Sequence, residues 1–113
     1  MEGYNNLIYL YGYSSKDNNL FDHLLKIIKE QIPKGARISI VLIHDGVIGT
    51  SKRSMISNFI AELLRLSINI YAMIPDLNAR GIDPKDLRNQ VIGISYEDLV
   101  DILVEATNII SWM

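Results

Sequence analysis

The sequence predicts an α/β fold, organised as a single three-layer α/β/α domain around a mainly parallel sheet of about five strands. Short apolar segments alternate with amphipathic segments along the chain, and this order is typical of right-handed β-α-β crossovers. The strand segments are apolar without alternation, as expected where helices cover both faces of a sheet. A chain of 113 residues has the length of one small domain, so we expect residues 1–113 to form one domain.

Five short segments have the composition of strands, because they are rich in β-branched and aromatic residues. The first, 7–11, ends at Gly12, and the third, 68–74, ends at Pro75. The remaining three lie at 37–43, at 91–94 and, near the end of the chain, at 109–112.

Three longer segments have the periodicity of amphipathic helices. The first, 20–32, is closed by Pro33 and Gly35, and the second covers 51–66. The third follows Ser95, which forms with Asp98 the pattern of a capping box. The apolar stripes that we expect to face the sheet are Leu20, Phe21, Leu24, Leu25, Ile28 and Ile32 in the first helix, Ile56, Phe59, Ile60, Leu63 and Leu64 in the second, and Leu99, Val100, Leu103 and Val104 in the third.

Two short turns are predicted between the third and fourth strands. Residues 76–81 fit one helical turn closed by Gly81. A second turn begins at Asp83-Pro84, with the acid as N-cap and the proline in the first helical position.

The composition argues against several classes of function. A net charge of −2 predicts no large basic surface and therefore no direct binding of nucleic acid. The sequence holds no cysteine and two histidines, which predicts no disulfide, no metal site and no cysteine nucleophile. No apolar run approaches the ~20 residues of a membrane helix, and residues 1–15 lack the features of a signal peptide. We expect a cytoplasmic protein without a cofactor.

The segments that follow the strands are the places to look for a site, because ligands of open α/β sheets bind outside the carboxyl ends of the strands. Four segments qualify: 12–15, 44–46, 75–76 and 95–96. We expect them to lie along one rim of the sheet.

His44-Asp45-Gly46, at the end of the second strand, has two interpretations. His44 could be a general base oriented by the carboxylate of Asp45. Adjacent residues at a strand end usually point apart, however, and Asp-Gly is a common turn signal. No nucleophile motif such as GxSxG accompanies the pair. Catalysis is therefore the least favoured role, a turn is the simplest, and a binding or interface role stays open.

Ser51, Lys52 and Arg53 begin the second predicted helix and could hold an anion there with backbone N–H groups and two cations. The segment does not match the GxxxxGK[ST] or GxGxxG spacing. The simpler interpretation is that Ser51 is a helix cap and the two cations are solvated, because cations oppose the helix dipole at that end.

The order and spacing of three segments resemble the DsrH/TusB family of sulfur-relay proteins over about residues 7–112. These segments are SIVLIHDGVIGT (39–50), IYAMIPDLNARGI (70–82) and VIGISYEDLVDILVEATNIISWM (91–113). The most specific pieces are 76–81, which includes Asp76 and Arg80, and Ser111-Trp112.

The resemblance implies a small α/β domain that assembles with DsrE/TusD-like and DsrF/TusC-like chains into hetero-oligomers, or with itself if these are absent. Such assemblies pass persulfide sulfur between cysteines, toward 2-thiouridine at the tRNA wobble position or in sulfur oxidation. Some members carry a cysteine in the first helix, and the alignment places His23 at or near it. This chain has no cysteine, so the resemblance implies an accessory subunit and not a sulfur carrier. At His23, an imidazole could instead stabilise an incoming thiolate or persulfide.

Three further possibilities follow. Trp112 could be a buried anchor for a partner, since tryptophan is favoured at interface centres, or it could pack on its own sheet. A rival function is a small nucleotide- or anion-binding enzyme that uses His44 and Asp45 with Ser51–Arg53. The third hypothesis for the function is a scaffold module without chemistry.

Overall fold

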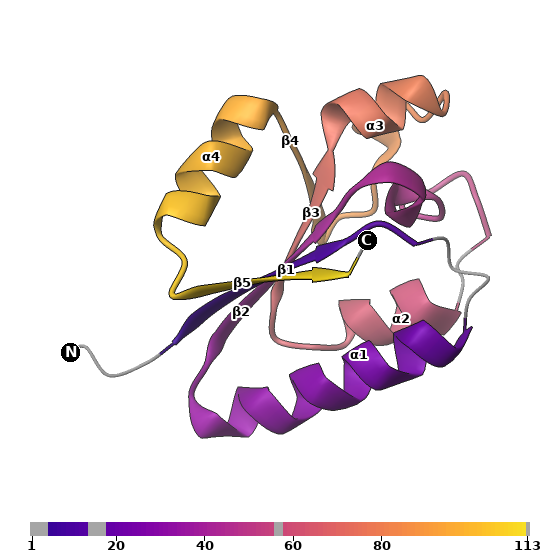
Figure 1. Ribbon diagram of the computed structural model, residues 1–113. Coiled ribbons are helices and arrows are strands. Elements are labelled where there is room, and N and C mark those ends of the chain that lie inside the picture. Colours follow the sequence, from indigo (N-terminus) through magenta and orange to yellow (C-terminus); the bar gives the residue numbers. More distant parts are fainter. Residues whose placement is uncertain (1–4, 14–17, 56–57, 113) are drawn as a thin grey trace.

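The computed structural model describes residues 5–13, 18–55 and 58–112, and its centre is a five-stranded sheet in the order β4-β3-β2-β1-β5 (Figure 1). Every neighbouring pair of strands is parallel, which confirms the predicted α/β class and the mainly parallel sheet. The strands are β1 (Asn6–Tyr11), β2 (Arg37–Leu42), β3 (Asn69–Met73), β4 (Val91–Ile94) and β5 (Asn108–Trp112).

The helices lie between successive strands, as the alternating pattern predicts. The α-helices are α1 (Asn18–Gln31), α2 (Asn58–Leu64), α3 (Ile74–Ala79) and α4 (Tyr96–Val104). The described residues also form the short 3₁₀ helices η1 (Ile32–Lys34), η2 (His44–Val47) and η3 (Pro84–Asp86). The predicted caps are present: the Asp83 side chain accepts a hydrogen bond from the N–H of Lys85, and Ser95 and Asp98 form a capping box.

Helices cover both faces of the sheet, with α1 and α2 on one side and α4 on the other (Figure 1). The chain steps from β1 to β4 in one direction and then returns past β1 to β5. Because β-α-β crossovers are right-handed, this reversal of direction places α4 on the opposite face from α1 and α2. Within the described ranges, no helix combines the length and apolar character that crossing a membrane requires.

The start of the second predicted helix is wrong. The α-helix begins at Asn58, and Ser51 instead forms a bridge with Leu87, beside η3. The N–H of Lys52 donates to the carbonyl of Asp86 at 2.7 Å, and the Ser51 hydroxyl accepts from the N–H of Arg53 at 3.1 Å. The bridge and the Lys52 bond use the backbone of this segment in contacts with the distant residues 86 and 87, which local periodicity does not reveal. Ile56, predicted in the buried stripe, lies outside the described residues.

Two other expectations need correction. The third strand was predicted to extend to residue 74 and to end at Pro75. Strand β3 instead ends at Met73, and α3 begins at Ile74 and holds the proline in its first turn. In α4, Val100 and Val104 are 57% and 77% exposed. The residues that pack on the sheet are Leu99, Ile102, Leu103 and Ala106.

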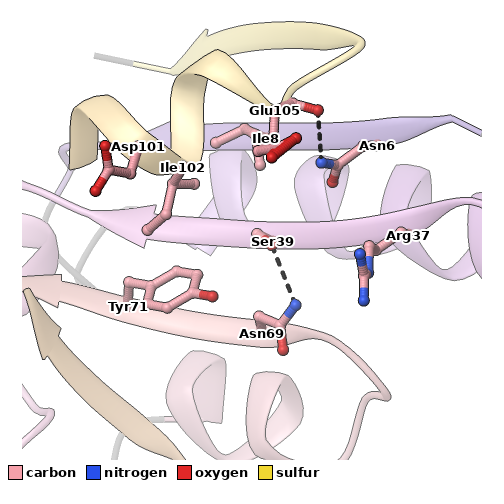
Figure 2. Close-up of a pocket in the computed structure, with 9 residues that line it drawn as sticks. All are labelled: Asn6, Ile8, Arg37, Ser39, Asn69, Tyr71, Asp101, Ile102 and Glu105. Atoms are coloured by element: carbon pink, nitrogen blue, oxygen red, sulfur yellow. Dashed lines mark hydrogen bonds between the residues drawn. The ribbon is translucent and has the colours of Figure 1, made fainter. Parts of the chain in front are cut away.

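Because α4 covers only part of its face, a polar groove of about 480 Å³ remains beside it over the starts of β2 and β3 (Figure 2). In its floor the Asn69 amide donates to the Ser39 hydroxyl at 3.3 Å. The groove is lined by Asn6, Ile8, Arg37, Ser39, Asn69, Tyr71, Asp101, Ile102 and Glu105.

Candidate functional site

The carboxyl ends of all five strands meet at one rim of the sheet, as predicted. The N–H of Ile43 donates to the carbonyl of Tyr11, and the N–H of Gly12 donates to the carbonyl of Trp112, both at 2.9 Å. These bonds bring the ends of β1, β2 and β5 together. Ser14 and Ser15, which were expected on this rim, lie outside the described residues.

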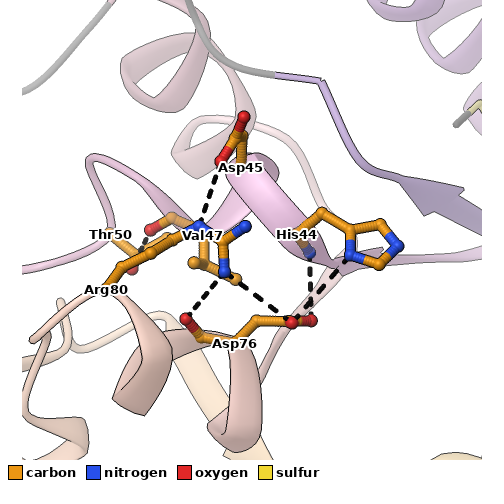
Figure 3. A network of polar contacts seen from close by, with 6 residues as sticks. All are labelled: His44, Asp45, Val47, Thr50, Asp76 and Arg80. Carbon is orange, nitrogen blue, oxygen red and sulfur yellow. Dashed lines mark hydrogen bonds and ion pairs between the residues drawn. The ribbon is translucent and has the colours of Figure 1, made fainter.

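His44 follows β2 on this rim in an unusual conformation, with a φ of +48°. Among the described residues it is the one non-glycine position with positive φ. Its N–H donates to Oδ2 of Asp76 at 3.0 Å, and its Nδ1 lies 4.0 Å from the other carboxylate oxygen (Figure 3). The left-handed conformation costs on the order of 1–3 kcal/mol, so the surrounding contacts must maintain it.

Arg80, from the end of α3, joins the same network. Its Nε donates to Oδ1 of Asp45 at 3.0 Å, and its Nη1 donates to the carbonyl of Asp76 at 3.1 Å (Figure 3). Nη1 also lies 3.8 Å from the Asp76 carboxylate. Four predicted candidates, His44, Asp45, Asp76 and Arg80, therefore form one polar cluster that ties η2 to α3; below we call it the rim network.

The close contact between backbones at η2 explains Gly46. A Cβ added there would lie 2.4 Å from the carbonyl oxygen of Tyr11. Because this neighbour is backbone, no rotation of a side chain can relieve the clash. Gly46 thus lets η2 sit against the end of β1 and positions His44 and Asp45, which precede it.

The rim network differs from the proposed His44-Asp45 catalytic pair. Asp76, and not Asp45, is the carboxylate beside His44, while Asp45 is paired with Arg80. Figure 3 also shows Thr50 beside the network. This residue is buried, and its hydroxyl donates to the carbonyl of Val47 at 2.7 Å. Where the structure describes the chain, no three histidine, aspartate or glutamate side chains are grouped as metal ligands. What the network offers is an exposed imidazole, with 63% of its side chain accessible, on a fixed backbone.

The predicted anion site at Ser51, Lys52 and Arg53 loses the helix N-terminus on which it depended, because α2 begins at Asn58. Arg53 is also paired: its Nε lies 2.9 Å from Oδ2 of Asp86. Lys52 is exposed. The rival hypothesis was an anion-binding enzyme. It therefore lacks both the His44-Asp45 catalytic pair and the helix N-terminus at Ser51 on which it depended.

His23 and Trp112 are not members of the rim network. His23 is exposed on α1. Trp112 ends β5, is partly buried and packs against the core cluster beneath the α1 and α2 face. Its indole thus contacts its own domain and also keeps some accessible surface.

The polar groove beside α4 was not predicted from the sequence, because only the carboxyl ends of the strands were considered as places for a site. A signal was present, because Arg37, Ser39 and Asn69 are polar residues at or near the starts of otherwise apolar strands. These positions indicate a part of the sheet face that no helix covers.

Comparison with known proteins gives matches over most of the chain. The family model described as "DsrH like protein" matches residues 14–109. Two curated proteins named Protein TusB, from Pectobacterium carotovorum subsp. carotovorum (strain PC1) and Pectobacterium atrosepticum, are each 32% identical to this chain over 74 residues. The aligned part is 66% of this chain and 74% of each relative.

Solved structures share the fold at lower identity. MTH1491 of Methanobacterium thermoautotrophicum, a protein of unknown function, superposes with a TM-score of 0.71 at 21% identity and covers 96% of this chain and 99% of its own. The YchN protein of E. coli gives a TM-score of 0.74 at 10% identity with the same coverage. At these identities the likeness establishes the fold alone.

Proposed function

Because this chain belongs to the DsrH family, we propose that it is a non-catalytic subunit of a sulfur-relay complex that passes persulfide sulfur. The observation that carries the proposal is the family match over residues 14–109, taken together with the lack of any cysteine in the sequence. A persulfide needs a cysteine sulfur, so the sulfur must travel on other chains of the complex. The proposed destinations are the 2-thiolation of tRNA wobble uridine or sulfur oxidation.

The proposed partners are small α/β chains of the DsrE/TusD and DsrF/TusC type, with self-association where these are absent. The chain's net charge of −2 favours such protein contacts over direct contact with tRNA. A relay of thiols requires a reducing compartment, which for this proposal is the cytoplasm. No cofactor is needed, because transfer between a persulfide and a thiolate is an exchange between sulfur atoms.

The rim network is proposed as part of the surface that meets a partner. Its charges are largely paired within the chain: Asp45 with Arg80, and Asp76 with both Arg80 and the His44 N–H. A surface of paired charges can be covered by a partner at lower cost than one with isolated charges. His44 is the exposed group of this surface.

His23 is proposed as a second contact, on the first helix where the family resemblance places a cysteine in some members. Its side chain is exposed on α1, so a partner can reach it. A protonated imidazole beside an incoming thiolate would lower the pKa of that thiol and favour the reactive anion.

The test is reconstitution with one chain of each of the two proposed partner types. The donor chain is loaded with ³⁵S persulfide, and transfer to the acceptor cysteine is followed with and without this subunit. We expect this chain to co-purify in the complex, to remain unlabelled, and to increase transfer. A chain that joins neither partner, or whose omission leaves transfer unchanged, would refute the proposal.

The role of His23 is tested in the same assay. We expect His23→Ala to reduce transfer while leaving assembly intact, whereas Lys26→Ala, at another exposed position of α1, should leave both unchanged. Undiminished transfer with His23→Ala would remove His23 from the mechanism and leave the subunit proposal standing.

A further inference from the structure

The polar groove beside α4 lies toward the other end of the sheet from the rim network. Its floor consists of residues at or near the starts of β1, β2 and β3, whereas the rim network follows the carboxyl ends of β2 and β3. The volume of the groove, about 480 Å³, is within the range typical of sites for small ligands. The groove is therefore a second candidate site, separate from the surface assigned above to a partner.

Unpaired charges of opposite sign lie at the two ends of the groove. Figure 2 shows Arg37 at one end, Asp101 at the other and Glu105 between them. None of these three side chains forms an ion pair with another described residue. In the rim network, by contrast, Arg80 is paired with Asp45 at 3.0 Å. The groove can therefore offer charge-assisted hydrogen bonds to a ligand at both of its ends.

The two ends suit different chemical groups. At the Asp101 end, the partly buried side chain of Tyr71 also lines the groove, and a carboxylate near an aromatic ring is a favourable environment for an ammonium group. At the other end, the guanidinium of Arg37 can bind a carboxylate with two parallel hydrogen bonds. A ligand that satisfies both ends is a zwitterion whose charges are far apart.

The middle of the groove is polar, which favours amide groups over a hydrocarbon chain. Ser39 is 4% exposed, and its hydroxyl accepts a hydrogen bond from the Asn69 amide at 3.3 Å. The proton of this hydroxyl has no acceptor within the part of the chain that the structure describes. A ligand carbonyl can accept it, and a ligand N–H can donate to Glu105. A peptide bond supplies both kinds of group.

The register of the sheet gives the length of the ligand. Tyr71 is opposite Val41, and Arg37 precedes Val41 by four positions on β2. At about 3.3 Å per residue, the two ends of the groove are roughly 13 Å apart along the strands. Three extended residues span about 10 Å, and the charged side chains that line the two ends occupy the remainder. A peptide of about three residues therefore fits.

We propose that this groove binds a short peptide with free termini, with its ammonium group at Asp101 and Tyr71 and its carboxylate at Arg37. Ser39 and Glu105 then form hydrogen bonds with the peptide groups between the two ends. The proposal goes beyond the relay function, because it concerns a different surface and requires no sulfur chemistry.

The binding test uses the full chain and triglycine, followed by chemical-shift changes in ¹H-¹⁵N spectra. Three related compounds are compared with it. Triglycine amide lacks the carboxylate, N-acetyltriglycine lacks the ammonium group, and ω-aminooctanoate has both charges the same number of bonds apart but no amides. We expect triglycine to shift the resonances of Ser39, Asn69 and Asp101, and to bind at least ~10-fold more tightly than each of the other three compounds.

Variants that remove one charge assign each end of the ligand. We expect Arg37→Gln to weaken triglycine binding by at least ~10-fold and to abolish the preference for triglycine over triglycine amide. Asp101→Asn should instead reduce the preference for triglycine over N-acetyltriglycine. The matched controls are Lys26→Gln and Asp22→Asn, at exposed positions of α1 on the other face of the sheet, and these should leave binding unchanged. Equal urea midpoints establish that every variant is folded.

Several outcomes would overturn the proposal. One is a lack of shifts at the groove with triglycine, and another is equal binding of the two blocked peptides. Binding of ω-aminooctanoate as tight as that of triglycine would refute the assignment of a peptide. Losses in the α1 controls as large as that in Arg37→Gln would attribute the effect to overall charge and refute the site. These measurements involve no sulfur transfer, so their failure leaves the relay proposal untouched.

Discussion

The main-chain N–H of His44 donates to the Oδ2 of Asp76 at 3.0 Å and so ties the end of β2 to the first turn of α3. The bond is made while His44 has a φ of +48°, a conformation that most residues avoid. The contact therefore explains how the rim holds a strained residue in place. It also gives three predictions about the stability of the rim.

The first concerns the conformation of His44. Asparagine tolerates the left-handed region, whereas a β-branched residue does not. We expect His44→Asn to change the free energy of unfolding by less than about 0.5 kcal/mol and His44→Val to lower it by roughly 1–3 kcal/mol. Urea unfolding followed by circular dichroism measures both. If valine is tolerated as well as asparagine, the backbone at position 44 is not constrained as described.

The second concerns the carboxylate of Asp76. This side chain is 19% exposed, accepts the His44 N–H and lies near Arg80. We expect Asp76→Ala to lower the free energy of unfolding by about 1.5–3 kcal/mol, the contribution typical of a hydrogen bond to a charged group. Asp76→Asn keeps an acceptor oxygen and should cost less. Asp101→Ala, at an exposed position of α4, is the control, and a loss there equal to that of Asp76→Ala would contradict a specific role.

The third concerns Gly46. A Cβ at this position would meet the Tyr11 carbonyl oxygen at 2.4 Å, whereas a Cβ at Gly12 would meet the His44 ring at 3.3 Å. A side chain can shift and a sheet backbone cannot. We expect Gly46→Ala to lower the free energy of unfolding by more than about 3 kcal/mol and Gly12→Ala by about 1 kcal/mol or less. Equal thermal midpoints for the two variants would show that η2 can move away from β1.

Much of the fold could be predicted because local patterns determine it. The Ser95 capping box and the Asp83 cap depend on residues a few positions apart, and the strands are recognisable by their unalternating apolar composition. The start of α2 could not be predicted in this way, because Ser51 is held by Leu87, far along the chain. The burial of α4 depends on its rotation over the sheet, which periodicity leaves open by about one residue; hence Val100 and Val104 were placed in the core.

The sequence predicted which residues belong to the candidate site, but it did not predict which of them pair with one another. The rule that strand ends carry ligands brought His44, Asp45 and Asp76 to one rim, where the structure also places them. That Asp76, and not Asp45, faces His44 follows from the conformation of a single residue, the left-handed His44. One backbone angle of this kind has no signature in composition or spacing. Histidine is only a weak sign of it, because histidine is enriched in this region but glycine is the usual residue there.

The last prediction concerns pH and the phenol of Tyr9. Tyr9 is buried in the sheet face beneath α1, and its hydroxyl donates to Oε1 of Gln31 at 2.6 Å. Burial raises the pKa of Tyr9 above its usual value of 10.0, although the hydrogen bond with Gln31 acts in the opposite direction. The folded chain thus prefers the protonated phenol more strongly than the unfolded chain does. The resulting stabilisation is fully present below pH 10 and is lost as the pH rises through the raised value.

Spectrophotometric titration at the phenolate absorbance should therefore show Tyr9 ionising later than the exposed tyrosines. Tyr11 is buried as well, so the test compares variants: Tyr9→Phe should decrease the late part of the titration by one phenol and reduce the loss of stability above pH 10. Tyr96→Phe, at a phenol that is 62% exposed, should leave the late part unchanged. A late part that is undiminished in Tyr9→Phe would show that burial of Tyr9 does not control the alkaline stability.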